Sequence, residues 1–141
     1  MKKIENFKKS LEVLKNADFN KVNDDEIYRT GVVGQFNLTF ELAWKALQQV
    51  MRDHGVDGAE TGSPREILQL GYKVGFIDDE MAWLTMLRKR NIGTHEYDED
   101  EIEELVLLVR DSFISTFGVL LKVLEEKDGE SKLQENVISD V

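Results

Sequence analysis

Apolar residues recur every three or four positions along most of the chain, and this period predicts α-helices. One such stretch covers about residues 2–17, and two much longer ones cover about 24–54 and about 98–126. No stretch alternates apolar and polar residues long enough to predict a sheet, so we expect an all-α protein. The apolar positions with this period are Ile4, Phe7, Leu11, Leu14, Val33, Phe36, Phe40, Ala43, Leu47, Val50, Ile102, Leu105, Val109, Phe113, Phe117, Leu120 and Leu124.

Polar residues that cap helices precede both long stretches. Asn23 is followed three residues later by Glu26, and Asp98 is followed in the same way by Glu101. In this spacing the first side chain accepts from the backbone of the first turn while the acid bonds back to the cap. The two long helices are therefore predicted to begin at these residues.

Two shorter helices are predicted between the long ones. Ser63 is a suitable cap, Pro64 fits the first helical position, where its missing N–H is not needed, and Glu66 completes a capping box. This helix is expected to run to about Lys73, and Asp78 is predicted to cap the next one.

The lengths and order of these segments predict an antiparallel up-and-down helical bundle of about five helices, two of them long. A chain of 141 residues is most compatible with one domain. We expect that domain to cover residues 1–126, followed by a polar, frayed C-terminal tail over residues 127–141.

Both long helices also carry apolar residues outside their main stripe, and a bundle of this size cannot bury so wide an apolar surface alone. A homodimer with helix faces at its interface is therefore predicted. The residues outside the stripes are Leu38, Leu42, Trp44, Val106, Ile114, Val119 and Val123.

Composition narrows the functional classes. The net charge of −10 argues against a protein that coats nucleic acid through bulk electrostatics, although it leaves room for a local basic site. The chain has no cysteine, its first residues lack the apolar core of a signal peptide, and no apolar run approaches the roughly 20 residues of a membrane span. We therefore expect a cytoplasmic protein without a membrane partner.

The candidate chemistry lies between the fourth and fifth predicted helices, in Arg90, Asn91, His95 and Tyr97. An arginine holds a phosphate bidentately, and a histidine that titrates near neutrality moves protons to or from a ribose hydroxyl. These residue types suit metal-independent phosphate chemistry. The same residues also suit a plain helix junction, in which Arg90 bonds to helix-end carbonyls and Tyr97 packs before the next cap.

Other sites are less well supported by the sequence. The acids beside His95 lack the spacing of a metal site and already suit the first turn of a helix, so neither a metal nor a cofactor is expected. The chain also lacks a glycine-rich phosphate loop and a sheet, and is not expected to be a nucleotidyltransferase itself.

Glu41 has two possible roles. It either forms an exposed helix pair with Lys45, one turn away, or faces the motif and orients Arg90 or His95. The two tryptophans, Trp44 and Trp83, are expected to anchor the core or an interface rather than to stack on bases.

Three blocks of the chain resemble the nucleotidyltransferase substrate-binding protein family, a branch of the HEPN superfamily. They are FNLTFELAWKAL (Phe36–Leu47), SPREILQLGYKVGFID (Ser63–Asp78) and WLTMLRKRNIGTHEYDED (Trp83–Asp100). The resemblance covers about residues 5–125. It implies a helical bundle that dimerises and that works with a separate, minimal nucleotidyltransferase.

A related toxin branch of the superfamily suggests residue roles. The resemblance implies that Arg90 and His95 form a metal-independent ribonuclease pair, with Asn91 as the polar residue beside the arginine. It also implies that the partner, acting as antitoxin, adds adenylyl groups to Tyr97. Two alternatives stay open: a non-catalytic subunit that presents a nucleotide or another substrate to the nucleotidyltransferase, and a scaffold in which the motif only stabilises the helix junction.

Overall fold

The computed structural model describes residues 1–92 and 98–139, with side-chain surroundings described as far as residue 133. Within these residues all regular structure is helical, which confirms the predicted all-α class. None of the described helices is long and apolar enough to cross a membrane. The elements are α1 (Lys2–Lys15), α2 (Glu26–Asp53), α3 (Pro64–Lys73), α4 (Glu80–Lys89), α5 (Glu99–Leu108), the π-helix η1 (Val109–Phe113) and α6 (Ile114–Ser139).

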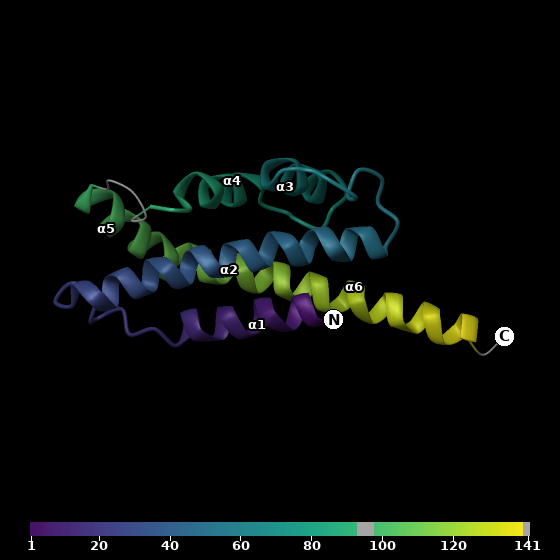
Figure 1. Ribbon diagram of the computed structural model, residues 1–141, viewed down its shortest axis with the longest axis horizontal. Helices are drawn as coiled ribbons and strands as arrows, with labels where there is room; N and C mark the ends of the chain where they lie inside the picture. The colour runs from purple at the N-terminus through teal and green to yellow at the C-terminus, as the bar shows by residue number, and fades with distance from the viewer. Residues whose placement is uncertain (93–97, 140–141) are drawn as a thin grey trace.

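The helices form an elongated up-and-down bundle (Figure 1). The chain runs along the long axis in α1, returns in α2, comes back through the two short helices α3 and α4, and returns again through α5, η1 and α6. α1 packs against both α2 and α6, whereas α3 and α4 lie on the other side of α2. α3 and α4 follow one another along the bundle in the place of a single long helix. The end of α4 therefore lies beside the middle of α2.

An aromatic cluster joins the helices at the centre of the bundle. The rings of Phe36 on α2 and Phe113 on η1 stack with centroids 5.5 Å apart. Phe117 on α6 contacts Phe7 on α1 at 6.1 Å and Trp83 on α4 at 5.7 Å, both edge to face. Trp83 is 2% exposed, so the prediction that it anchors the core is confirmed.

The π-helix η1 keeps the long apolar stripe of the last predicted helix facing the core. Leu105, Val109, Phe113 and Phe117 follow one another at intervals of four, and all are buried. In a regular α-helix three such steps would carry the side chains about 120° around the axis, because four residues exceed one turn by about 40°. The π-turn at Val109–Phe113 contains the extra residue and keeps the stripe on the core side.

Two predicted helix starts were wrong by one or two residues. The cap of α2 is Asp25 rather than Asn23, and its carboxylate accepts from the Tyr28 N–H at 3.0 Å. The cap of α4 is Asp79 rather than Asp78. In both cases the true cap has the extended φ that leaves its side chain free to reach the first turn, at −130° for Asp25 and −122° for Asp79.

The other two predicted caps, Ser63 and Asp98, were correct. Ser63 and Glu66 form the reciprocal capping box, with both bonds at 3.2 Å, and Pro64 occupies the first position of α3. Asp98 caps α5 and accepts from the Asp100 N–H at 2.9 Å.

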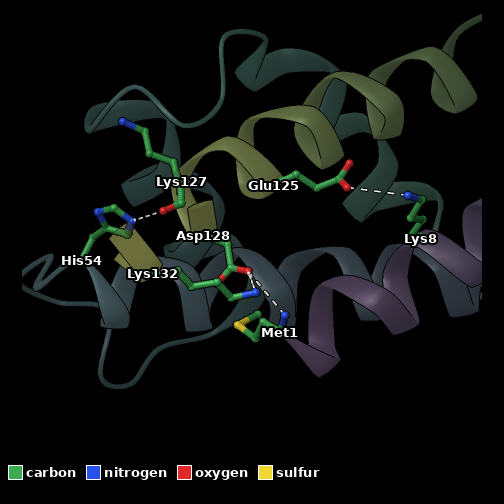
Figure 2. Close-up of polar contacts among 7 residues, drawn as sticks. All are labelled: Met1, Lys8, His54, Glu125, Lys127, Asp128 and Lys132. Atoms are coloured by element: carbon green, nitrogen blue, oxygen red, sulfur yellow. Dashed lines mark hydrogen bonds and ion pairs between the residues drawn. The ribbon is translucent and has the colours of Figure 1, made fainter. Parts of the chain in front are cut away.

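α6 continues to Ser139, beyond the predicted helix end near residue 126. The C-terminal end of α2 supports this extension: Nε2 of His54 lies 2.8 Å from the carbonyl oxygen of Lys127 (Figure 2). The ring of His54 also meets Phe76 edge to face, with centroids 6.2 Å apart. Residues 127–139 thus belong to α6.

Ionic contacts tie the same part of α6 to α1. The N-terminal ammonium of Met1 lies 3.4 Å from Asp128, and Lys8 lies 3.7 Å from Glu125 (Figure 2). Within α6, Lys132 pairs with Asp128 at 3.2 Å. Asp128 thus has two cationic partners, which fixes the start of α1 against the far half of α6.

Replacing Phe117 by alanine is expected to lower the free energy of unfolding by about 3–5 kcal/mol, because the ring is fully buried between three helices. Leu133→Ala is the matched control on the same helix: Leu133 is 66% exposed, and loss of its side chain should cost less than about 1 kcal/mol. Urea unfolding followed by far-UV circular dichroism measures both values. Equal losses would contradict the central place given to the aromatic cluster.

Candidate functional site

The candidate site is built around the residue that ends α4. Arg90 is the C-cap of that helix, with extended φ and ψ of −61° and 151°, and its N–H still donates to the Met86 carbonyl at 2.9 Å. Asn91 follows with a φ of 66°, in the left-handed region. The chain therefore leaves the helix in a sharp turn within two residues.

Arg90 is held by α2. Its Nη1 donates to Oε1 of Glu41 at 3.3 Å, and the two side chains are 31% and 39% exposed. The second oxygen of Glu41, Oε2, accepts from the indole Nε1 of Trp44 at 2.9 Å. Of the partners predicted for Glu41, the structure shows the contact with Arg90. Nζ of Lys45 instead lies over the Trp44 ring, 5.9 Å from its centroid.

Asn37, which was not among the predicted site residues, also contacts this turn. Its Oδ1 accepts the backbone N–H of Asn91 at 2.9 Å. Asn37, Glu41 and Trp44 are spaced by four and three residues, so they share one face of α2. That spacing was the available signal, but the sequence could not indicate that the end of α4 would pack on this face.

The other two predicted site residues, His95 and Tyr97, lie within residues 93–97, outside the described part of the chain. Their roles remain predictions. The described part of the site consists of Arg90, Asn91 and the three α2 side chains before this segment, and of the Asp98 cap after it.

The acids that begin α5 are partly paired. Glu99 lies 3.5 Å from Nη2 of Arg29 on α2, and Glu104 lies 3.1 Å from Nζ of Lys89 on α4. These pairs cross from α5 to both neighbouring helices. The acidic run is thus used in part to attach α5 to the bundle.

A cavity of about 430 Å³ opens beside the Arg29–Glu99 pair. Arg110, on its wall, makes a bidentate contact with Asp111, at 2.7 and 3.0 Å. The hydrogen bonds from Arg110 hold the pKa of Asp111 below its ordinary value. The lining residues are Phe19, Val22, Asn23, Arg29, Glu99, Glu103, Val106, Leu107 and Arg110.

No group of three or more histidine, aspartate or glutamate side chains suited to a metal ion occurs among residues 1–92 and 98–133, whose side chains the structure describes. The chemistry that the described residues support is that of a fixed guanidinium. Arg90 presents donors at a partly exposed turn, and one carboxylate orients it from behind.

Comparison with known proteins identifies the fold. The structure resembles the Haemophilus influenzae protein HI0074, described as having the fold of a substrate binding domain of a nucleotidyltransferase, with a TM-score of 0.72 and 21% identity over 86% of this chain and 98% of that one. A protein from Thermus thermophilus matches with a TM-score of 0.65 and 24% identity, covering 89% of this chain and 98% of its own. These likenesses confirm the predicted helical fold.

Comparison of sequences gives the family. A Haemophilus influenzae protein named "Probable ribonuclease HepT" is 23% identical over 100 residues, which cover 70% of this chain and 68% of the relative. A family model described as "Nucleotidyltransferase substrate binding protein like" matches residues 2–126. The match covers most of the chain and confirms the family predicted from its three sequence blocks: this protein belongs to the nucleotidyltransferase substrate binding protein-like family.

Proposed function

We propose that this chain is the helical partner of a small, separate nucleotidyltransferase in a toxin–antitoxin module, and that it is itself a metal-independent endoribonuclease. Membership of the substrate binding family and the likeness to a protein named as a probable ribonuclease support this proposal. Arg90 and His95 are its catalytic pair, Asn91 and Glu41 support the arginine, and Tyr97 is the residue that the partner modifies.

The observation that carries the proposal is the way Arg90 is held. A guanidinium has five donors, and the contact with Glu41 engages Nη1. The remaining donors of a partly exposed side chain are able to bind a phosphate while the carboxylate keeps the side chain in place.

In the proposed reaction, His95 takes the proton from a ribose 2′ hydroxyl as the hydroxyl oxygen attacks the adjacent phosphorus. The bond from phosphorus to the 5′ oxygen breaks, that oxygen takes a proton from water, and the resulting hydroxide removes the proton held by His95. Arg90 binds the phosphate oxygens, on which negative charge grows in the transition state. The products are a 2′,3′-cyclic phosphate and a free 5′ hydroxyl.

In this proposal, modification of Tyr97 by the partner regulates the ribonuclease activity. The phenol oxygen loses its proton to solvent and attacks the α-phosphorus of ATP on the partner enzyme, pyrophosphate leaves, and an adenylyl group remains on the tyrosine. This places a phosphodiester anion within a few residues of Arg90 and His95. RNA and the adenylyl group then compete for the same cation.

A homodimer is part of the proposal, with α2 at its interface. Ile27 is 85% and Leu38 50% exposed, and a Cβ added at Gly31 or Gly34 would have no heavy atom within 4 Å. These four residues follow at intervals of four, three and four, the spacing of a helix-pairing stripe. Such a stripe with two bare glycines allows close approach of a second helix.

The structure changes which predicted residues are available for that interface. Leu38 and Val119 are half-exposed, as an interface requires, whereas Val106 is only 5% exposed and is part of the protomer core. Leu42, Trp44, Ile114 and Val123 are partly buried against the core.

A non-catalytic subunit that binds a nucleotide or another substrate for the nucleotidyltransferase is the second candidate. The description of the HI0074 fold as a substrate binding domain favours it, and the cavity beside Arg29 has a suitable size for a small ligand. In this case the Arg90 turn would bind phosphate without cleaving it.

The purified protein is expected to cleave single-stranded RNA in the presence of EDTA, and Arg90→Ala or His95→Ala should lower the rate at least about 100-fold. His54→Gln is the matched control, because His54 is the other of only two histidines and lies at the far end of α2. Gel analysis of a labelled oligonucleotide measures the rates. RNA that stays intact with the wild-type protein would support the binding subunit instead.

Incubation with the partner nucleotidyltransferase and ATP should add adenylyl groups that intact-protein mass spectrometry detects. The additions should disappear in Tyr97→Phe and persist in Tyr72→Phe, a matched control at an exposed tyrosine. Additions that survive in Tyr97→Phe would show that another residue is the acceptor.

Light scattering at micromolar concentration should give twice the mass of the chain. Leu38→Glu should weaken the dimer at least about tenfold, because it buries a charge at the edge of the α2 stripe. Met81→Glu introduces the same charge at a position on α4 that is 67% exposed, and should leave association unchanged. A monomeric wild-type protein would remove the dimer from the proposal.

A further inference from the structure

We propose that Asn37 and Trp44 are positioning residues for Arg90, and that together with Glu41 they form a rigid support on α2, here called the α2 support. This inference rests on the proposed role of Arg90 in phosphate chemistry, which it deepens. Neither Asn37 nor Trp44 acts on the phosphate; each fixes a group that determines where the guanidinium lies.

The first part of the support is a shared carboxylate. Glu41 accepts from Trp44 Nε1 at 2.9 Å through one oxygen and from Arg90 Nη1 at 3.3 Å through the other. An isolated glutamate on a helix surface samples several rotamers. The indole is bulky and partly buried, so its N–H fixes one carboxylate oxygen and thereby determines where the other meets the arginine.

The second part acts on the backbone. Asn91 has a φ of 66°, a region that costs energy for residues other than glycine and that asparagine tolerates better than most. Asn37 accepts the Asn91 N–H at 2.9 Å in this conformation. The direction in which the chain leaves α4 is therefore set from α2, immediately after the residue whose side chain Glu41 holds.

Stability does not explain this cluster. The Arg90–Glu41 pair is 31% and 39% exposed, and pairs in such positions contribute only about 0–1 kcal/mol. An apolar contact at the same place would join α2 and α4 equally well. Asn37 and Glu41 each bond to one of two successive residues at the end of α4, and Trp44 bonds to Glu41, so the cluster gives orientation instead.

The chemical consequence concerns the plane of the guanidinium. A planar fork binds two phosphate oxygens only when its orientation is right, whereas an ammonium group has no such requirement. A small rotation of Glu41 would tilt this plane without moving the backbone. Loss of the support should therefore impair the transition state more than substrate binding.

The geometry can be tested without any assay of activity. The chain has two tryptophans, so its ¹H–¹⁵N spectrum should show two indole signals, and Trp44→Phe identifies the one from Trp44. Arg90→Ala and Glu41→Gln should each shift the Trp44 signal and leave that of Trp83, in the core, within line width. A Trp44 signal that does not respond to either change would overturn the inference, whatever the protein does to RNA.

The positioning role is tested by kinetics on the full-length chain. Trp44→Phe keeps a ring but removes the donor, and should lower kcat for RNA cleavage about tenfold with KM changed less than about twofold and Tm unaffected. In an Arg90→Ala background the same change should have no further effect. An equal loss of kcat in both backgrounds, or a loss that follows Tm, would assign Trp44 a purely structural role.

Asn37 offers a conservative rescue. Asn37→Ala should lower kcat about tenfold, whereas Asn37→Asp keeps an acceptor for the Asn91 N–H and should stay within about threefold of wild type. Equal losses in the two variants would exclude the backbone contact as the cause. If the wild-type protein cleaves no RNA, the proposed function fails while the indole spectra still decide whether the α2 support exists.

Discussion

The packing of Phe117 against three other helices is the contact on which the rest of the structure depends. Its ring lies between Phe7 of α1, Phe36 of α2 and Trp83 of α4, with centroid distances of 5.7 to 6.1 Å. Trp83 lies about two turns before Arg90, along the same helix. The aromatic cluster therefore fixes the position of α4 against α2, and with it the distance from Arg90 to Glu41. A partly exposed site is positioned by a fully buried contact.

The fold was largely predictable because apolar period and helix caps are local signals. Even the π-turn left a trace: Leu105, Val109, Phe113 and Phe117 are spaced by four, which a regular helix cannot keep on one face. The errors were equally local. At each wrongly predicted cap, a nearby acid or amide was an equally suitable cap by residue type. Only the backbone angles of the folded chain select Asp25 or Asp79.

The site was predictable only in part because its contacts join residues far apart in sequence. Arg90 stood out by its chemical type. Glu41 had two possible roles, a pair with Lys45 or a contact with the motif, and the structure shows the contact with Arg90. Asn37 and Trp44 carried no signal beyond a helix face shared with Glu41, since an amide and an indole on an amphipathic helix have many ordinary uses. Their relevance arises only when α4 ends against their face of α2. The second half of the motif lies in residues 93–97, outside the described part of the chain.

The net charge of −10 shapes how such a site is able to select a ligand. Arg90 is paired with Glu41, and this neutral pair attracts phosphate weakly at long range. Glu99 and Glu104 pair with Arg29 and Lys89, which reduces the repulsion that these two acids exert near the turn. In the proposed phosphate site, long-range attraction therefore contributes little, and recognition rests on the directed donors of a fixed guanidinium. Because that recognition depends on geometry, the side chains that orient Arg90 matter as much as its charge.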